Sequence, residues 1–517
     1  MSPSPPPTVV WFKRDLRVSD HEPLWEAAQR GPVVALYIYE PELLKDECTH
    51  SAHYVFINGC LAELDERLRE LGGCLTIRRG EAVEVLESLR AETDFRLLLS
   101  HQETGKAVTY ARDLRVKRWA QDSGVAWREY RQHGVFRGQT DRDGWAARWE
   151  RSMRAMPVPP VQRLAPYRAL GSYGVATLET LGLEPLTRTV LQPPGERAAF
   201  ATLASFLEQR GETYQKAMSS PELGETACSR LSPYIAYGAI SIRTVYQAYL
   251  ERIETVRALQ REGVGGLGSW ARALSSFNKR LHWNGHFIQR LESDPSIEHH
   301  NLVRSFDVLR DDSPDETLLE AWKTGHTGYP MVDACMRYLN ATGWLNFRMR
   351  AMVVSFASYH LWLPWQLTGK HLAKQFLDYE PGIHYNQLQM QSGVTGINAV
   401  RIYSPTKQAL DQDPDGHFIR RWVPELQAVP ARCLAEPHTM DMIEQLESSF
   451  QVGVTYPLPI VDHRQAVASA KEQIFAVRRT AAAREQAKDV LRRHGSRRKR
   501  STSRRKRSTT QTTKRVT

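Results

Sequence analysis

The sequence has no long apolar run. None of its 517 residues fall in a stretch of about 18 consecutive apolar side chains, so it predicts no membrane-spanning helix. The opening segment, Met1 to Pro7, has neither the charged nor the apolar region of a secretion signal. We therefore expect a cytoplasmic protein, or a nuclear one in a eukaryotic host.

Cysteine is scarce and scattered. The chain has six cysteines and no C-x-x-C pair. In a chain of this length that pattern excludes a disulfide framework and argues against structural zinc or cysteine-ligated iron–sulfur clusters. His282 and His286 have the i, i+4 spacing of a zinc-binding pair, but the H-E-x-x-H motif is missing. We expect no metal site.

Acidic residues are missing from the C-terminal end. The chain carries a net charge of +11, and residues 492–517 hold twelve Lys and Arg with no Asp or Glu, so the remainder is close to neutral. Residues 471–493 can continue as a charged helix, whereas residues 496–513 are too poor in apolar side chains to fold alone. We expect residues 481–517 to form a basic, disordered tail that binds the nucleic-acid backbone, with a solvated tail or a nuclear-import signal as alternatives.

The rest of the chain divides into an N-terminal α/β part and a helical part. Residues 1–132 alternate short aliphatic segments with helical ones, which predicts a doubly wound parallel sheet. Residues 133–197 read as a polar interdomain connection, and residues 198–480 as an all-helical domain. The glycine-rich segment 263–268 has the spacing G-x-G-G-x-G, but it interrupts helices, so we interpret it as a loop and not as a phosphate cradle. The strand-like segments are 9–12, 33–38, 75–77 and 95–99, and the helical ones are 23–29, 52–71, 82–89 and 106–121.

Two arginines lie in an apolar stretch of the helical part. Arg348 and Arg350 are two residues apart, so at least one is expected to point inward and to need a carboxylate partner. Asp378 and Glu380 are the candidates.

Four segments together resemble one known family. They are Val-Val-Trp-Phe-Lys-Arg-Asp-Leu-Arg at 9–17, Cys-Ser-Arg-Leu-Ser-Pro-Tyr-Ile-Ala-Tyr-Gly at 228–238, residues 321–350, and Phe-Ile-Arg-Arg-Trp-Val-Pro-Glu-Leu at 418–426. In this order the sequence is similar to the photolyase/cryptochrome family from about residue 9 to 480. The resemblance implies FAD in the all-helical C-terminal domain and a second, antenna pigment of the folate or deazaflavin type at the α/β domain.

The resemblance also implies a set of cofactor contacts. Ser229 and Ser232 would offer hydroxyls to the FAD pyrophosphate, with an ordinary helix cap as the alternative. Arg350 and Asp378 would form the ion pair that flanks the flavin. His384 would lie beside the flavin N5 edge, where it could donate a hydrogen bond or a proton, or else cap a helix. The full set is Tyr214, Cys228, Ser229, Arg230, Leu231, Ser232, Phe277, Arg280, Asn284, Arg350, Asp378, Tyr379, Glu380 and His384.

The resemblance also implies contacts to the substrate. Three positions in this region depart from the family pattern. The expected substrate residues are Trp283, Phe347, Arg348 and Met390, with core packing as the alternative for Trp283. Arg280 stands where cyclobutane-dimer enzymes carry a dimer-binding glutamate. Phe347 replaces an asparagine, and Met390 replaces a stacking tryptophan.

Electron transfer is also expected to follow an unusual route. The resemblance implies catalytic roles for Trp365, Trp344 and His384, with Trp365 as the middle member of a tryptophan chain. Leu388 stands at the flavin-proximal position, so the route would need other aromatic side chains. The candidates are Trp344, Tyr359, Trp362 and Tyr385, although core packing explains them equally well.

Two functions follow from the resemblance. One is light-driven DNA repair, in which reduced FAD passes an electron to a flipped-out pyrimidine dimer in UV-damaged DNA. The other is a cryptochrome-like photoreceptor that signals to a partner. The altered pocket favours the photoreceptor, and the lack of an obvious effector domain after Leu446 favours repair. A redox flavoprotein that uses no light is a weaker third interpretation, and a monomer is favoured.

Overall fold

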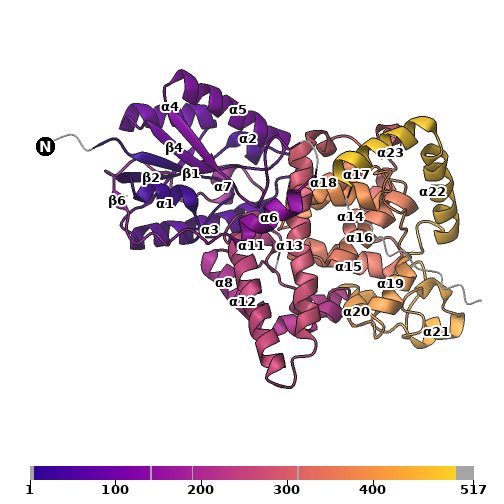
Figure 1. Cartoon of the computed structure of the whole chain (residues 1–517). Coiled ribbons are helices and arrows are strands. Elements are labelled where there is room, and N and C mark those ends of the chain that lie inside the picture. The colour runs from indigo at the N-terminus through magenta and orange to yellow at the C-terminus, as the bar shows by residue number, and fades with distance from the viewer. Residues whose placement is uncertain (1–4, 140–141, 189, 311–313, 496–517) are drawn as a thin grey trace, which may run out of the picture.

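The computed structural model describes residues 5–139, 142–188, 190–310 and 314–495. Figure 1 shows an α/β domain at one end of the molecule, joined to a larger body of helices. The strands are β1 (Thr8–Phe12), β2 (Pro32–Tyr39), β3 (Leu75–Arg79), β4 (Leu97–His101), β5 (Ala126–Tyr130) and β6 (Ala165–Pro166). The helices of the first domain and the connection are α1 (Glu22–Ala28), α2 (Pro41–Leu44), α3 (Ser51–Glu70), α4 (Ala82–Thr93), α5 (Ala107–Asp122), α6 (Trp145–Arg154) and α7 (Leu178–Leu181).

The helical body follows the connection. Its earlier helices are α8 (Glu196–Glu208), α9 (Tyr214–Ala217), α10 (Pro221–Ala227), α11 (Ser232–Ala236), α12 (Ile242–Arg261), α13 (Trp270–Ser293), α14 (Glu316–Thr324), α15 (Pro330–Thr342) and α16 (Phe347–Ser355). Its later helices are α17 (Trp365–Gln375), α18 (Pro381–Gln391), α19 (Pro405–Gln412), α20 (His417–Trp422), α21 (Met442–Glu447), α22 (His463–Arg478) and α23 (Ala481–His494). The segment 263–268 lies between α12 and α13, as the loop interpretation predicted.

The sheet confirms the predicted doubly wound architecture. Its strand order is β3-β2-β1-β4-β5, and each pair is parallel. Side chains of a strand alternate between the two faces of a sheet, and β1 shows this directly. Val10 and Phe12 pack in the core that contains α1 and α3, whereas Val9 and Trp11 pack in the core that contains α4 and α5. Strand β5 was not predicted, because it is a half-exposed edge strand without an aliphatic run.

Residues 133–197 are more than a polar connection, which corrects the prediction. Helix α6 buries Trp145, Trp149 and Met153, which are spaced four residues apart and therefore share one helix face. The Trp149 ring lies 4.2 Å from the ring of His282 on α13. Strand β6 also lies in this segment and pairs with β2. The connection thus contributes a packed helix to the body.

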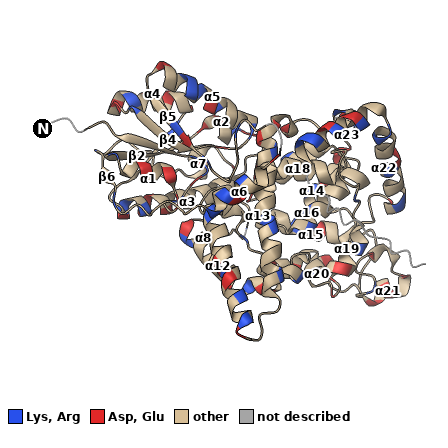
Figure 2. Ribbon diagram, viewed as in Figure 1, with Lys and Arg blue, Asp and Glu red and all other residues tan. Residues whose placement is uncertain are grey.

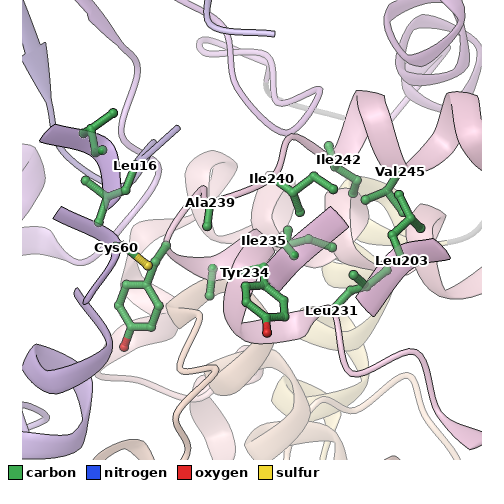
Figure 3. Close-up of a cluster of buried hydrophobic side chains, with 14 of the residues drawn as sticks. Leu16, Cys60, Leu203, Leu231, Tyr234, Ile235, Ala239, Ile240, Ile242 and Val245 are labelled. Atoms are coloured by element: carbon green, nitrogen blue, oxygen red, sulfur yellow. The ribbon is translucent and has the colours of Figure 1, made fainter. Parts of the chain in front are cut away.

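The two predicted domains share a hydrophobic core. Figure 3 shows Leu16 and Cys60 of the α/β domain near Tyr234 and Ile235 of α11. Phe56 of α3 lies 5.7 Å from Tyr234, measured between ring centroids. The helical body therefore packs directly on the α/β domain.

The predicted tail begins with a folded helix, α23, which agrees with the charged helix expected up to residue 493 and corrects the disorder expected from residue 481. Ala483 and Val490 of α23 are 2% and 1% exposed. Arg493 Nη1 lies 3.0 Å from Asp294 Oδ2 at the end of α13, so α23 is attached to the body. The rest of the predicted tail, residues 496–517, lies outside the described residues. Figure 2 shows basic and acidic residues interspersed along the described helices. Within the described part of the chain, no helix is long and apolar enough to cross a membrane.

Candidate functional site

A cavity of about 290 Å³ lies inside the helical body. Its walls come from α11, α13, α16 and α18 and from the segment before α11. Every residue predicted to contact the cofactor lines it, although they come from positions as far apart as 214 and 384. Trp344, Trp283 and Phe347 line the cavity as well. The fold therefore gathers most of the predicted site residues around one space.

Helical periodicity explains which predicted residues the cavity leaves out. On α16 the lining residues Phe347, Arg350, Ala351 and Val354 have the i, i+3, i+4, i+7 spacing of one face. Arg348 is rotated away from that face and lies outside the lining. Of the two arginines expected to point inward, Arg350 is the one that does.

Met390 and Trp365 also lie outside the lining. On α18 the cavity is lined by Ile383, His384, Gln387, Leu388 and Gln391, whereas Met390 is not among the lining residues. Trp365 is 2% exposed, and its indole Nε1 donates to Asn301 Oδ1 at 2.7 Å. Neither side chain reaches the cavity directly.

An ion pair between Arg350 and Asp378 lies in the cavity wall. Arg350 Nη2 lies 2.8 Å from Asp378 Oδ2, and its guanidinium carbon lies 4.0 Å from the centroid of the Phe376 ring. Asp378 Oδ1 is buried and has no hydrogen-bond partner among the described residues. Because a buried carboxylate oxygen without a donor is costly, this atom is suited to accept an N–H from a ligand.

Glu380 is held by the α/β domain and not by Arg350. Its carboxylate lies 3.3 Å from Arg14 Nη2, and it accepts from the backbone N–H of Gly382 at the start of α18. Burial raises the pKa of Glu380. Arg14 also donates to the carbonyls of Ala236 and Tyr379, at 2.8 and 2.9 Å. Arg14 thus connects the segment before α18 to the end of α11, and both contribute to the cavity wall. No local pattern around Arg14 indicated this role.

The segment before α11 presents a second arginine. Arg230 has a φ of 60°, an uncommon conformation for a residue with a side chain. Its guanidinium carbon lies 4.0 Å from the centroid of the Trp344 ring, and its Nη1 has no hydrogen-bond partner among the described residues. The described residues include no ion pair to Arg230, so its charge is available to an anionic ligand.

Arg210 holds this segment in place. It donates to the carbonyls of Thr226 and Ser229 at 2.8 and 2.7 Å, and to that of Cys228. Sequence reasoning missed Arg210 because its acceptors are backbone atoms 16 to 19 residues away. Among the described residues α11 has no side-chain cap bond at its own N-cap, Leu231, although Ser229 Oγ accepts from the Leu231 backbone N–H at 3.5 Å.

His384 is a buried, neutral imidazole. Its Nε2 lies 2.9 Å from the Gly369 carbonyl, so Nε2 carries the proton. Burial lowers the pKa of His384 to about 4. Glu380 is the N-cap of α18, so the helix-cap alternative for His384 does not hold. With Nε2–H bound to Gly369, the remaining Nδ1 can only accept, which corrects the expectation of a donor at this position.

Aromatic side chains connect the cavity to Trp365. The Trp365 ring lies 6.3 Å from that of Tyr385, whose hydroxyl lies 3.0 Å from the Tyr379 hydroxyl. Tyr379 lines the cavity. Tyr359 and Trp362, the other two candidates away from the lining, pack near Gly393 and Arg310.

The mouth of the cavity carries two partly exposed aromatic rings. Trp283 of α13 is 43% exposed and Phe347 of α16 is 39% exposed, and their centroids are 6.1 Å apart. The core-packing alternative for Trp283 is inconsistent with this exposure. Arg280 lies against both rings, with its guanidinium carbon 4.5 Å from the Trp283 centroid and 4.7 Å from the Phe347 centroid. Burial raises the pKa of the neighbouring Tyr214 hydroxyl to about 12, against the opposing charge of Arg280.

A second cavity of about 140 Å³ lies at the carboxyl ends of the strands. Residues that follow β1, β2 and β4 line it, among them Arg14, Glu40 and Glu103. This is where the sheet reverses its strand order, the usual ligand position in doubly wound folds. Tyr379 borders both cavities.

One side-chain group near this edge has the composition of a metal site. Asp15 Oδ2 lies 2.9 Å from His21 Nε2 and 2.7 Å from His101 Nδ1. His21 Nδ1 accepts from the backbone N–H of Leu24. We therefore interpret the group as a hydrogen-bonded cluster that holds these segments together. No local sequence pattern indicates this group, because its members are up to 86 residues apart. His282 and His286 instead lie against aromatic rings of α6.

Comparisons with known proteins agree with this geometry. Residues 8–144 match the family model described as DNA photolyase, and residues 277–476 match that described as FAD binding domain of DNA photolyase. The chain is 30% identical over 500 residues to the cryptochrome DASH of Gloeobacter violaceus, covering 90% of this chain and 95% of the relative. It is 30% identical over 504 residues to the deoxyribodipyrimidine photo-lyase of Agrobacterium fabrum, covering 93% and 100%.

A solved structure is similar as well. The bacterial class III photolyase from Agrobacterium tumefaciens matches with a TM-score of 0.80 at 28% identity, covering 93% of this chain and 99% of that one. The matches span the sheet, the FAD-binding helices and nearly the full length of the relatives. The chain therefore belongs to the photolyase/cryptochrome family.

Proposed function

We propose that the protein is a light-driven DNA repair flavoenzyme that splits pyrimidine dimers. The observation that supports this most directly is the mouth of the cavity. Trp283 and Phe347 present partly exposed rings to a cavity whose wall carries the Arg350 to Asp378 ion pair. A base flipped out of DNA needs aromatic surfaces to replace its lost stacking and a cavity to enter.

The residues present fit FAD. Arg230 offers an uncompensated cation and a donor without a partner to a diphosphate, and Asp378 Oδ1 offers an acceptor without a donor to a ring N–H. When bound, FAD would supply the absorption of blue light and the transferable electron. Arg350 would place a positive charge beside the flavin ring, and His384 would present a neutral Nδ1 acceptor.

Other residues of the chain would supply electron transfer to the FAD and the site for the antenna pigment. Trp365 and Tyr385 lead toward Tyr379 at the cavity wall and would carry electrons in, while Trp344 lies under Arg230. We propose that the second cavity, at the carboxyl ends of the strands, holds the antenna pigment. Tyr379 separates the two cavities, so pigment and FAD would lie close together.

A second candidate is a photoreceptor that uses the same cofactor without repair. Arg280 lies against both mouth rings, so in this structure it narrows the entrance that a dimer would use. Some relatives of similar identity are cryptochromes, such as cryptochrome-2 of Arabidopsis thaliana at 29% over 483 residues.

A repair assay separates the two candidates. The purified protein is incubated with oligonucleotides that each carry one defined photoproduct, with blue light and in the dark. Repair predicts light-dependent return of intact pyrimidines, and Trp283→Ala should reduce it. If no photoproduct is repaired while blue light still bleaches the bound flavin in the presence of a reductant, the photoreceptor is favoured. A flavin that does not bleach points to a redox protein that uses no light.

A further inference from the structure

Arg280 lies against two aromatic rings at the cavity mouth. It lies on α13, and its guanidinium is within 4.7 Å of both the Trp283 and the Phe347 ring centroids. A planar guanidinium beside two rings loses much of its freedom to rotate, since stacking favours a few orientations. The position of the guanidinium is therefore set by side chains of α13 and α16.

The N–H donors of this guanidinium are only partly satisfied by the protein, because the Tyr214 hydroxyl accepts a hydrogen bond from Arg280 but no carboxylate among the described residues does. Within the described part of the chain no ion pair includes Arg280, its Nη1 has no hydrogen-bond partner, and its Nη2 contacts the sulfur of Met218 at 3.8 Å. Sulfur of a thioether is a weak acceptor. The cavity's carboxylates, Asp378 and Glu380, are already paired with Arg350 and Arg14. Nη1, which has no partner among the described residues, and Nη2, which has only a weak one, are thus available to a ligand.

We propose that Arg280 determines which pyrimidine lesion the protein binds, by donating paired hydrogen bonds to two neighbouring acceptors on the flipped-out base. This inference rests on the proposed function, because it requires a base at the mouth. The preferred ligand is a dimer that contains cytosine, whose N3 and O2 are adjacent acceptors. Thymine places an N3–H donor between its two carbonyls, and that donor would face the donors of Arg280.

The paired N–H donors of a guanidinium explain the preference for cytosine. Arginine binds paired acceptors on a base edge, and a good bidentate contact discriminates against the wrong base by about ten-fold or more. Two donors facing each other add a repulsive contribution to the discrimination. Lysine at the same position would keep the charge but lose the paired, planar N–H donors. A carboxylate would invert the choice, since it can only accept.

Binding in the dark tests this without relying on turnover. FAD-loaded full-length protein is titrated against labelled oligonucleotides that carry no lesion, a thymine–thymine dimer, or a freshly prepared thymine–cytosine dimer. The same thymine–cytosine oligonucleotide is titrated again after its cytosine has been deaminated to uracil, which replaces the N3 acceptor with N3–H. The variants are Arg280→Lys and Arg280→Glu, and FAD content is measured for each.

The expected result is about ten-fold tighter binding of the cytosine dimer by the wild type, lost after deamination. Arg280→Lys should bind both dimers alike, and Arg280→Glu should prefer thymine. Equal binding of both dimers by the wild type, above undamaged DNA, would overturn the inference and leave the proposed function standing. Binding of neither dimer above undamaged DNA would defeat the proposed function and the inference with it. Loss of FAD from both variants would assign Arg280 to the cofactor and overturn the inference.

Discussion

The arginines of the cavity differ in what neutralises their charge. Arg350 has a carboxylate partner in Asp378, whereas Arg230 and Arg280 are each packed on aromatic rings without one. An uncompensated cation in a cavity attracts an anion or a base with acceptor atoms. We therefore expect mutation of Asp378 to affect Arg350, whereas the charges of Arg230 and Arg280 would be compensated only by a bound ligand.

Removing the carboxylate partner of Arg350 tests the ion pair. Asp378→Ala should lower both the free energy of unfolding and the retention of FAD, because it leaves Arg350 uncompensated. Breaking a buried pair costs about 3–5 kcal/mol, and we expect the lower end because the Arg350 side chain is 26% exposed. Flavin absorbance per mole of protein and urea denaturation measure the two effects. Glu320→Ala, at an exposed pair on α14, is the control and should change neither. A yellow variant of normal stability would contradict the assignment.

The neutral state of His384 predicts a pH dependence. Its pKa in the folded protein is about 4, below the usual value of 6.5, so the unfolded chain takes up the proton first as the pH falls. Stability is therefore lost between about pH 6.5 and 4, and by pH 5 the loss amounts to about 2 kcal/mol. His384→Asn should lose less stability than the wild type between pH 7.5 and 5, as measured by urea denaturation. The exposed His438 supplies the control, since His438→Asn should keep the wild-type dependence. Identical pH profiles for wild type and His384→Asn would rule out a buried neutral imidazole.

Among the elements, α6 decides how the connection joins the helical body. Trp149 of α6 fills the space above Gly285 of α13, where an added Cβ would lie 2.4 Å from the indole Nε1. That distance is too short for any real contact, so the two helices can approach only because residue 285 has no side chain. The close approach also places α13, and with it Arg280 and Trp283, relative to the connection.

Filling that space should loosen the contact between α6 and α13. Gly285→Ala should lower the free energy of unfolding by about 1–3 kcal/mol, although alanine favours a helix by itself. Denaturation in urea measures the change. Gly265→Ala is the matched control, because no heavy atom lies within 4 Å of a Cβ at that position. A more stable Gly285→Ala variant would mean that α6 does not pack on α13 in solution.

Across the whole molecule, charge separates into a nearly neutral body and a basic end. Residues 496–517 contain ten Lys and Arg and no acid. The end of α23 is anchored by Arg493 and His494 at Asp294, which lies at the C-terminal end of the helix that carries Arg280. In the sequence these cations follow α23, which is attached to the C-terminal end of α13.

Truncation after Gly495 tests whether these cations bind DNA. Each phosphate neutralised adds about 0.9 to the slope of log affinity against log salt on duplex DNA, so engagement of half the cations gives a change of about 4–5. The truncated protein should bind undamaged DNA with a slope smaller by that amount and keep its FAD. A full-length variant with the ten cations replaced by Gln controls for length and should behave like the truncation. An unchanged salt slope in both variants would leave the basic end without a role in DNA binding.

The sequence by itself determined the architecture and most of the cavity. Alternating aliphatic and helical segments predicted the parallel sheet, because local patterns are enough to specify strands, helices and their order. The residues that line the cavity were implied by the resemblance to the family and not by periodicity. Local patterns also contained a signal for α6 that was missed, the four-residue spacing of Trp145, Trp149 and Met153.

Tertiary structure decided the rest, because it depends on atoms far apart in the chain. Only the fold shows that Arg14 pairs with Glu380, that Arg210 holds the carbonyls before α11, and that Arg348 faces away while Arg350 faces in. The proton on His384 Nε2 was likewise invisible in the sequence, since its acceptor is the carbonyl of Gly369 on another helix. Such contacts follow from packing geometry, which sets hydrogen-bond partners and charge neutralisation and which no local spacing encodes.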